Sequence, residues 1–360
     1  MAPELLTTGE DRGMVMMTSR SLTLALTLAW LVGLAGHLQA APQYRYYTTG
    51  QGDGSMAVAI NDNNQALVNF NDRAYLWTLS GGLTDLGDLG GGKSFGYDIN
   101  NLGQIVGESY INATTKRAFL WESGNMQNLG LQAGGTDSMA GSINNLGQVL
   151  GYTVYGDDWV PFIWTQAGGL QPLDLVGGLA FKIKDDGRMV GTKNNHAWLW
   201  TAPGPGQDLG TLPGFSYAEA SDINQSGQVV GWAGNNPENH YFPCRALSWT
   251  QGGGLQDLGT PGGPDARALA INKDGLIAGW ADYNLEGFTA GCLWTPGGDK
   301  LNLNTLVVNP PAGKIGDGIA INAQGVIVGQ MGGGGAAYML VPTIVPPTAN
   351  PAVLDLLLFQ

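Results

Sequence analysis

Residues Asp222 to Trp232 read DINQSGQVVGW, and versions of this stretch recur along most of the chain. Each copy is organised around Ile-Asn-x-x-Gly, and the Asn position, called the anchor below, recurs at steps of 39 to 50 residues. Asn is replaced by Lys in the fourth copy. The seven anchors are Asn61, Asn100, Asn144, Lys184, Asn224, Asn272 and Asn322. A period of this size is typical of repeat architectures, in which each copy is one supersecondary unit.

Each fixed position of the repeat has a local physical cause. Asn at the first position of a turn can hydrogen-bond its own backbone two residues on. Gly three residues after the anchor suits a left-handed conformation that closes a hairpin. The first copy has Asn64 instead, and Asn tolerates that conformation next best. Ala or Gly stands four residues before every anchor, which predicts a strand where neighbouring segments crowd together. We therefore expect these positions to be structural.

The segments between the turns predict four strands in each copy. An apolar stretch ending in Gly is followed by an Ala-aromatic-Leu-Trp strand, such as Arg73–Thr78, and then by Leu-x-Asp-Leu-Gly, such as Leu83–Gly87. Four strands in about 40 to 45 residues is the size of one propeller blade. The seventh copy stops after three strands, and the lone extended segment Tyr44–Tyr47 can supply its fourth, which removes an exposed edge.

We therefore expect an all-β fold: a seven-bladed β-propeller of four-stranded blades over residues 44–342, closed by the N-terminal strand in a 3+1 arrangement. A parallel β-solenoid is the alternative, but it would not need two complementary partial ends. The composition agrees, since the chain has 58 Gly in 360 residues and 12% charged residues. Its net charge of −13 argues against a nucleic-acid partner, because phosphate neutralisation needs clustered Lys and Arg.

The two ends of the chain lie outside this repeat. The apolar run Ser21–Gly36 follows Arg20 and precedes small residues at Ala40 and Ala41, as in a secretory signal peptide over residues 1–40. Since acidic residues precede it, we expect translation to start at Met14, Met16 or Met17. The run is short for a membrane span, so we expect export without a stable span after cleavage; an uncleaved anchor is the alternative. Residues 343–360 are expected to form a Pro-rich linker and a short apolar tail.

Three stretches together carry a resemblance to a known family. Asp222–Trp232, His196–Trp200 (HAWLW) and Gln256–Thr260 (QDLGT) resemble the HAF family of predicted extracellular repeat proteins of bacteria. The resemblance covers nearly all of the chain after the signal peptide. It implies an exported protein, secreted or periplasmic or at the cell surface, and it supplies no catalytic residues. The sequence departs from the family pattern where other copies have Arg73, Arg117 and Arg245 at the position of His196.

Candidate binding residues come from the loops between second and third strands, where the length variation collects. Binding residues commonly lie on such loops of a rigid scaffold. Three of these loops combine aromatic residues with Asn, Asp or both, which suits stacking on a sugar or anchoring a protein partner. Packing over neighbouring blades is the alternative for the aromatics. The candidates are Tyr152, Asp157, Trp159, Trp232, Asn235, His240, Tyr241, Trp280, Asp282 and Tyr283.

The sequence therefore predicts a monomeric, non-catalytic binding module for a glycan or a protein, with no cofactor. One alternative is an extracellular carbohydrate-active hydrolase or lyase, which would need paired carboxylates at a specific separation. Its candidates are Asp157, Asp158, Glu238, Asp282 and Glu286. A purely structural cell-surface protein is a further alternative. Spacing leaves open whether Cys244 and Cys292 form a disulfide or are two buried thiols.

Overall fold

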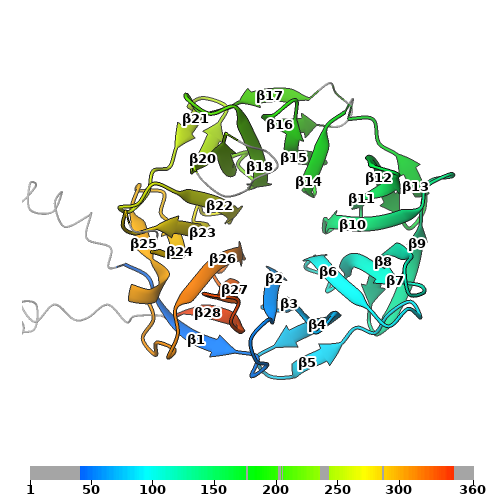
Figure 1. Cartoon of the computed structure of the whole chain (residues 1–360), viewed down its shortest axis with the longest axis horizontal. Helices are drawn as coiled ribbons and strands as arrows, with labels where there is room; N and C mark the ends of the chain where they lie inside the picture. The colour runs from blue at the N-terminus through cyan, green and yellow to red at the C-terminus, as the bar shows by residue number, and fades with distance from the viewer. Residues whose placement is uncertain are drawn as a thin grey trace, which may run out of the picture. The chain divides into compact units, whose positions relative to one another are not determined.

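The computed structural model describes residues 41–175, 177–201, 204, 206–235, 243–285 and 288–343. The predicted signal peptide (1–40) and residues 344–360 of the predicted tail lie outside the described residues. The described strands form seven four-stranded antiparallel sheets, which are the blades of a β-propeller arranged in a ring (Figure 1). The predicted fold class is therefore confirmed.

The first three blades follow one another along the chain with their strands in sequence order. Blade 1 contains β2 (Met56–Ile60), β3 (Ala66–Phe70), β4 (Arg73–Thr78) and β5 (Gly82–Asp85). Blade 2 contains β6 (Ser94–Ile99), β7 (Ile105–Tyr110), β8 (Lys116–Glu122) and β9 (Asn125–Gly130). Blade 3 contains β10 (Asp137–Ile143), β11 (Val149–Tyr155), β12 (Asp158–Thr165) and β13 (Gly169–Pro172).

Blades 4 to 6 repeat the same order. Blade 4 contains β14 (Leu179–Ile183), β15 (Arg188–Lys193), β16 (His196–Thr201) and β17 (Gln207–Gly210). Blade 5 contains β18 (Tyr217–Ile223), β19 (Val229–Gly234), β20 (Cys244–Thr250) and β21 (Gly254–Asp257). Blade 6 contains β22 (Ala266–Ile271), β23 (Ile277–Asp282), β24 (Thr289–Trp294) and β25 (Lys300–Asn302), and a short 3-10 helix η1 (Leu303–Thr305) follows it.

Blade 7 joins the two ends of the propeller. It contains β26 (Ile315–Ile321), β27 (Ile327–Met331) and β28 (Ala337–Thr343), and its outer strand is β1 (Gln43–Thr48). β1 pairs antiparallel with β28, and Tyr44 is opposite Pro342. The side chain of Tyr44 is buried, and its backbone N–H donates to Leu306 O at 2.8 Å. The N-terminal strand therefore supplies the fourth strand of the last blade, as the partial seventh copy predicts.

The repeat turns have the conformation that the sequence predicts. The backbone at the position three after each anchor is left-handed in all seven copies, for example φ +89° at Gly227 and φ 57° at Asn64. In each turn the anchor N–H donates to the carbonyl four residues on, such as Asn224 N to Gln228 O at 3.0 Å. These tight hairpins join the first two strands of every blade at one end of the central channel.

Crowding at the first strand explains the two small-residue positions of the repeat. In all seven blades the pairing of the first two strands shifts register just after the residue four before the anchor, such as Ala220. A β-bulge of this kind bends the strand locally. The Gly that ends the apolar stretch faces the bulge, and a Cβ on Gly231 would lie 1.9 Å from Glu219 O. Blade 1 has Val68 opposite Ala57 at this place.

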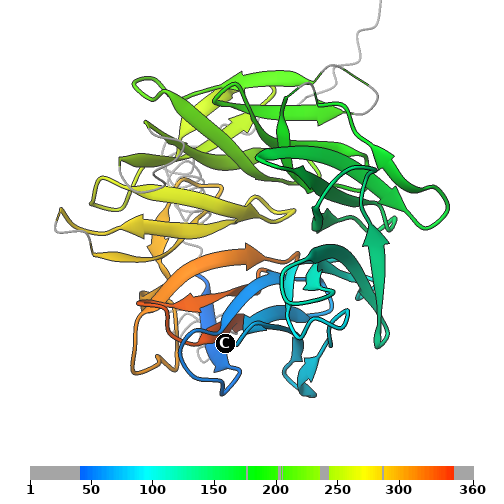
Figure 2. The ribbon, with the colours of Figure 1, turned by 45° about the vertical axis from the view of Figure 1, so that its right-hand side comes forward.

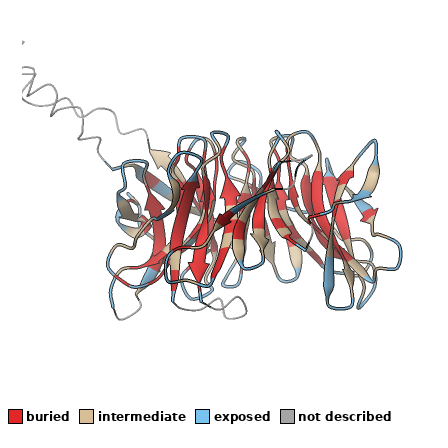
Figure 3. Ribbon diagram, turned by 90° about the horizontal axis from the view of Figure 1, so that it is seen from above, coloured by how far each residue is buried: buried red, intermediate tan, exposed pale blue. Residues whose placement is uncertain are grey.

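The core lies between the blades rather than in one central cluster. Viewed from the side, buried residues run along strands throughout the ring (Figure 3), and the tilted view shows successive sheets stacked around it (Figure 2). Apolar clusters join neighbouring blades; one contains Val190 of blade 4 and Ile223 of blade 5. Because most strands are covered on both faces, few strand positions face water, which accounts for the low charged fraction.

Candidate functional site

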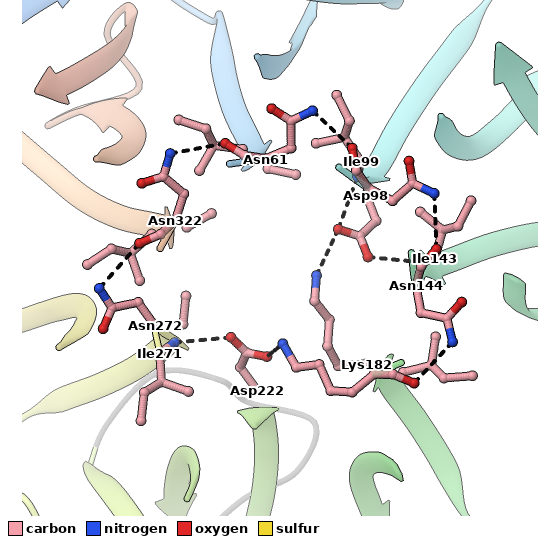
Figure 4. A pocket seen from close by; sticks show the side chains of 18 of the residues that line it. Asn61, Asp98, Ile99, Ile143, Asn144, Lys182, Asp222, Ile271, Asn272 and Asn322 are labelled. Carbon is pink, nitrogen blue, oxygen red and sulfur yellow. Dashed lines mark hydrogen bonds and ion pairs between the residues drawn. The ribbon is translucent and has the colours of Figure 1, made fainter. Parts of the chain in front are cut away.

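A cavity of about 530 Å³ lies at the centre of the ring, at the end that carries the anchor turns. All seven blades contribute to its lining through the first strand and the turn that follows it. Figure 4 shows these inner strands ending around the cavity, with the Asn anchors at its edge. A volume of this size is within the range of small-ligand sites.

The Asn anchors connect neighbouring blades as well as their own turns. The Nδ2 of each of the six Asn anchors donates to the backbone carbonyl of the next anchor at 2.9 to 3.3 Å, for example from Asn61 to Asn100 (Figure 4). The ring closes where Asn322 donates to Asn61 O at 3.0 Å. The Oδ1 of each of these side chains accepts hydrogen bonds from backbone N–H groups of its own turn. Asn61 Oδ1, for example, accepts from Gln65 N at 3.0 Å. The anchors therefore have a second structural role, between blades, that turn geometry alone does not reveal.

Blade 4 replaces this amide contact with charged side chains. The Lys184 turn keeps the backbone hydrogen bonds of the others, with Lys184 N donating to Arg188 O at 2.9 Å. Arg188 Nη2 lies 3.4 Å from Asn224 O and donates to Gln225 O at 2.9 Å. Lys184 Nζ lies 2.8 Å from Asp222 Oδ1. Two ionic side chains thus connect blade 4 to blade 5, where every other junction has an Asn amide.

The residue two before the anchor, which lines the cavity in every blade except blade 3, divides the ring of first strands into two arcs. Blades 6, 7 and 1 carry alanine at this position, whereas blades 2 to 5 carry polar or charged residues. The alanines are Ala270, Ala320 and Ala59. The others, called the polar arc below, are Asp98, Ser142, Lys182 and Asp222. All seven of these residues lie in first strands that have the register shift described above. The scaffold therefore accommodates either alanine or a polar residue at this position.

Asp98 is at the centre of the hydrogen bonding in the polar arc. Its Oδ2 accepts from Ser142 Oγ at 2.7 Å and from Ile143 N at 3.0 Å. Its Oδ1 accepts from Ile99 N at 3.1 Å and from Lys182 Nζ at 2.8 Å. Lys182 belongs to blade 4 and reaches past blade 3 to make this contact (Figure 4). Four donors meet one carboxylate, which is about its full capacity.

Asp222 occupies a corresponding place in blade 5. Its Oδ1 accepts from Ile223 N at 2.8 Å and pairs with Lys184, while its Oδ2 accepts from Ile271 N at 3.0 Å. Burial disfavours the charged form of Lys182, but the charges of Asp98 and Asp222 outweigh it and raise the pKa of Lys182 above its ordinary value. The ammonium of Lys182 therefore stays protonated across the physiological range.

The polar arc was missed by sequence reasoning that relied on the repeated residues. The available signal was the variable position two before the anchor, where acids and a lysine interrupt an otherwise apolar or small column. This signal cannot be interpreted without the arrangement of the blades, because Asp98 and Lys182 contact each other but are 84 residues apart in the sequence. Only the closed propeller brings them into contact.

The predicted loop residues fall into separate groups. Tyr152 is buried, and its hydroxyl bonds the backbone of Ala180 in the next blade at 2.5 to 2.6 Å. Trp232 is buried against Tyr217, with ring centroids 5.1 Å apart. The guanidinium carbon of Arg267 lies 3.9 Å from the Trp232 ring centroid and 5.8 Å from that of Trp280. For Tyr152 and Trp232 these contacts correspond to the packing alternative, because their side chains cover neighbouring blades and offer little surface to a ligand.

The other candidates on blades 5 and 6 also have internal partners. Asp282 is buried and accepts from Thr289 Oγ1 at 2.7 Å. Tyr283 is half-buried, and its hydroxyl lies 3.2 Å from Gly291 O. Asn235 is exposed and accepts from Ser216 N at 3.2 Å. His240 and Tyr241 lie outside the described residues.

Trp159 differs from the other candidate aromatics because 49% of its surface is exposed. It lies on β12 just after the β11–β12 hairpin turn, beside the exposed residues Asp157 and Asp158. The edge of one ring faces the other in the Tyr152–Trp159 pair, at a centroid distance of 6.2 Å. A buried tyrosine thus supports an exposed indole.

Among the described residues, the carboxylates considered for glycoside hydrolysis do not lie together at one site. Asp157 and Asp158 belong to blade 3, and the buried Asp282 belongs to blade 6 on the far side of the ring (Figure 1). Glu238 and Glu286 lie outside the described residues. The structure therefore supplies no paired acid and base from Asp157, Asp158 and Asp282.

The two cysteines are separate, buried thiols. Burial raises the pKa of Cys292 to about 12 and also raises that of Cys244. No group of three or more His, Cys, Asp or Glu side chains suited to a metal ion occurs in the described residues. In the same part of the chain, no helix has the length and apolar character needed to cross a membrane.

Comparison with known proteins supports the architecture alone. No protein-family model matches the sequence, and no curated protein sequence is significantly similar to it. A streptogramin B lyase structure is similar at 14% identity and a TM-score of 0.56, over 84% of this chain and 98% of that one. A catalytically inactive virginiamycin B lyase from Staphylococcus aureus, with quinupristin, is similar at 14% identity and a TM-score of 0.52, over 83% and 99%. At these identities the likeness shows the β-propeller fold and carries no activity over to this chain.

Proposed function

We propose that this chain is a secreted, non-catalytic β-propeller that binds a glycan through the β11–β12 hairpin. The observation that carries the proposal is the exposed indole of Trp159. An exposed aromatic face can stack on the apolar face of a sugar ring, and carboxylates accept hydrogen bonds from hydroxyl groups. Asp157 and Asp158 directly precede Trp159 and are exposed as well. A protein ligand that uses Trp159 as its anchor is the other outcome of the test.

A glycan array with the purified chain tests this proposal. We expect Trp159→Ala to abolish glycan binding, since stacking on Trp159 would supply most of the affinity. Leu146→Ala is the matched control, because Leu146 is also a large exposed apolar residue but lies on an anchor turn. If Trp159→Ala and Leu146→Ala bind the array equally well, the hairpin is not the site. Capture of a protein that depends on Trp159, with no glycan signal, would identify a protein ligand instead.

Export and family membership are part of the same proposal. They are supported by the apolar run Ser21–Gly36 after Arg20 and by the repeated motifs that resemble the HAF family. Mass spectrometry of the protein recovered outside the cytoplasm is expected to give a mature N-terminus near Ala41. Retention of residues 21–36 in the recovered protein would contradict cleavage. We also propose a monomer, which light scattering of the purified chain tests.

A further inference from the structure

Lys182 of the polar arc and the anchor Lys184 are more accessible from the central cavity than the carboxylates that they contact. Lys182 and Lys184 have side chains that are 29% and 28% exposed, against 6% for Asp98 and 9% for Asp222. Both lysines line the cavity. Within each of these two ion pairs, the lysine is therefore the partner more exposed to a ligand in the cavity.

The hydrogen bonds already made by the charged side chains of the cavity determine which ligand groups can still bind there. Asp98 already accepts four hydrogen bonds and Asp222 three, so little acceptor capacity is left. An ammonium has three N–H donors. Among the described residues, Lys182 and Lys184 each contact one carboxylate within 4.0 Å. Donors thus remain, and a ligand with acceptor atoms would satisfy them, whereas a cation at Asp98 or Asp222 would compete with the lysines for occupied carboxylates.

Apolar side chains line the same cavity. Val58, Phe181, Leu269 and Ile319 stand three residues before the anchors of their blades, and each is half-buried. The charges around the cavity are nearly balanced. Its lining contains the acids Asp62, Asp98, Asp185, Asp186 and Asp222 and the cations Lys182, Lys184, Arg188 and Lys273. A near-neutral lining suits a ligand with one negative charge better than one with two or more, since the acids would repel the larger charge.

We propose that the central cavity binds a small organic monocarboxylate with an apolar body. The carboxylate accepts hydrogen bonds from Lys182 and Lys184, and the body packs against the apolar lining near Phe181. Charge-assisted hydrogen bonds of this kind are stronger than neutral ones. The site uses none of the residues of the Trp159 hairpin, so it goes beyond the proposed glycan-binding function.

Calorimetric titration of the full chain with hexanoate, and with neutral hexanamide of the same length, tests the proposal. We expect hexanoate to bind about tenfold or more tightly than hexanamide, because the amide lacks the charge that the ammonium groups recognise. Acetate is also expected to bind about tenfold or more weakly than hexanoate, because it buries little apolar surface. Equal affinity for hexanoate and hexanamide, or no binding of hexanoate, would overturn the proposal.

Variants separate this site from the rest of the molecule. Lys182→Met and Lys184→Asn are expected to weaken hexanoate about tenfold each; Lys184→Asn introduces the residue of the other anchors and so preserves the turn. Lys273→Met is the control, since Lys273 also lines the cavity but is more exposed and pairs with Asp274 at 2.8 Å. Unchanged affinity in Lys184→Asn and in a folded Lys182→Met would contradict the site. Trp159→Ala should leave hexanoate binding unchanged, so that failure of the glycan proposal and failure of this one give different results.

Discussion

The two arcs of the ring of first strands have the same backbone and different chemistry. Blades 6, 7 and 1 place Ala270, Ala320 and Ala59 two residues before the anchor, and blades 2 to 5 place the polar arc there. The register shift and the anchor turn are common to both. The first group, Ala270, Ala320 and Ala59, is called the alanine arc, and it shows that the fold needs no charge at this position. Buried ion pairs are expensive to desolvate, so the polar arc points to a role other than holding the ring together.

Removing one member of the polar arc is expected to have the largest effect. Asp98→Ala installs the residue of the alanine arc but leaves Lys182, Ser142 and two backbone N–H groups without their acceptor. We expect a loss of about 3 kcal/mol in the free energy of unfolding, less than for a fully buried pair because Lys182 is partly exposed. Urea unfolding measures it, with Asp274→Ala on an exposed turn as the control. A loss no larger than that of the control would mean that Asp98 alone can be removed without destabilising the rest of the polar arc.

Removing an anchor amide should affect both arcs equally. Asn144→Ala in blade 3 and Asn322→Ala in blade 7 each remove four hydrogen bonds: Asn144 makes three within its turn and one to the next blade, and Asn322 makes two within its turn and two to the next blade. We expect each to lower the free energy of unfolding by about 2 kcal/mol. Urea unfolding of the two variants side by side makes the comparison. If one loss were more than twice the other, the anchor ring would not be a uniform feature of the scaffold.

Alkaline pH should weaken the polar arc through deprotonation of Lys182. The pKa of Lys182 is raised in the folded chain, so its contribution to stability is complete below the unfolded pKa near 10.5 and is lost as the pH rises through the higher folded value. The difference in unfolding free energy between the wild type and Lys182→Met should therefore shrink above pH 10.5 and stay constant between pH 7 and 9. Urea unfolding across this range measures the difference. A difference that shrinks already between pH 7 and 9 would disagree with a raised pKa.

The smallest effect is expected for Lys184, the lysine that stands at an anchor position in place of Asn. Lys184→Asn loses the ion pair with Asp222 but restores an amide in reach of the next anchor carbonyl. Since Lys184 is partly exposed, the loss should be small, and we expect a change in unfolding free energy within about 1 kcal/mol in either direction. Thermal unfolding is sufficient to detect it. A larger loss would indicate that the blade 4–5 junction depends on charge.

The parts of the structure that were predictable are those fixed by local chemistry. Three features have a local sequence signature: the left-handed residue three after each anchor, the small residue at the bulge and the missing fourth strand of the last copy. Together they predict seven blades with 3+1 closure. The polar arc depends on contacts between residues far apart in sequence, such as Asp98 and Lys182. Burial of Trp232 and exposure of Trp159 were equally beyond reach, because both are aromatic residues of similar loops and only the stacking of blades distinguishes them.

The most direct test is the unfolding free energy of the variant in which Asp98, Ser142, Lys182 and Asp222 are all alanine and Lys184, the ion-pair partner of Asp222, is asparagine. Replacing a whole buried ionic network is often nearly neutral, whereas breaking it at one member is costly. Backbone N–H groups freed by the change can be solvated, since the cavity is large enough for water. We predict that this variant folds and loses less stability than Asp98→Ala alone. A loss equal to or greater than that of Asp98→Ala would contradict the claim that the polar arc is not required by the fold.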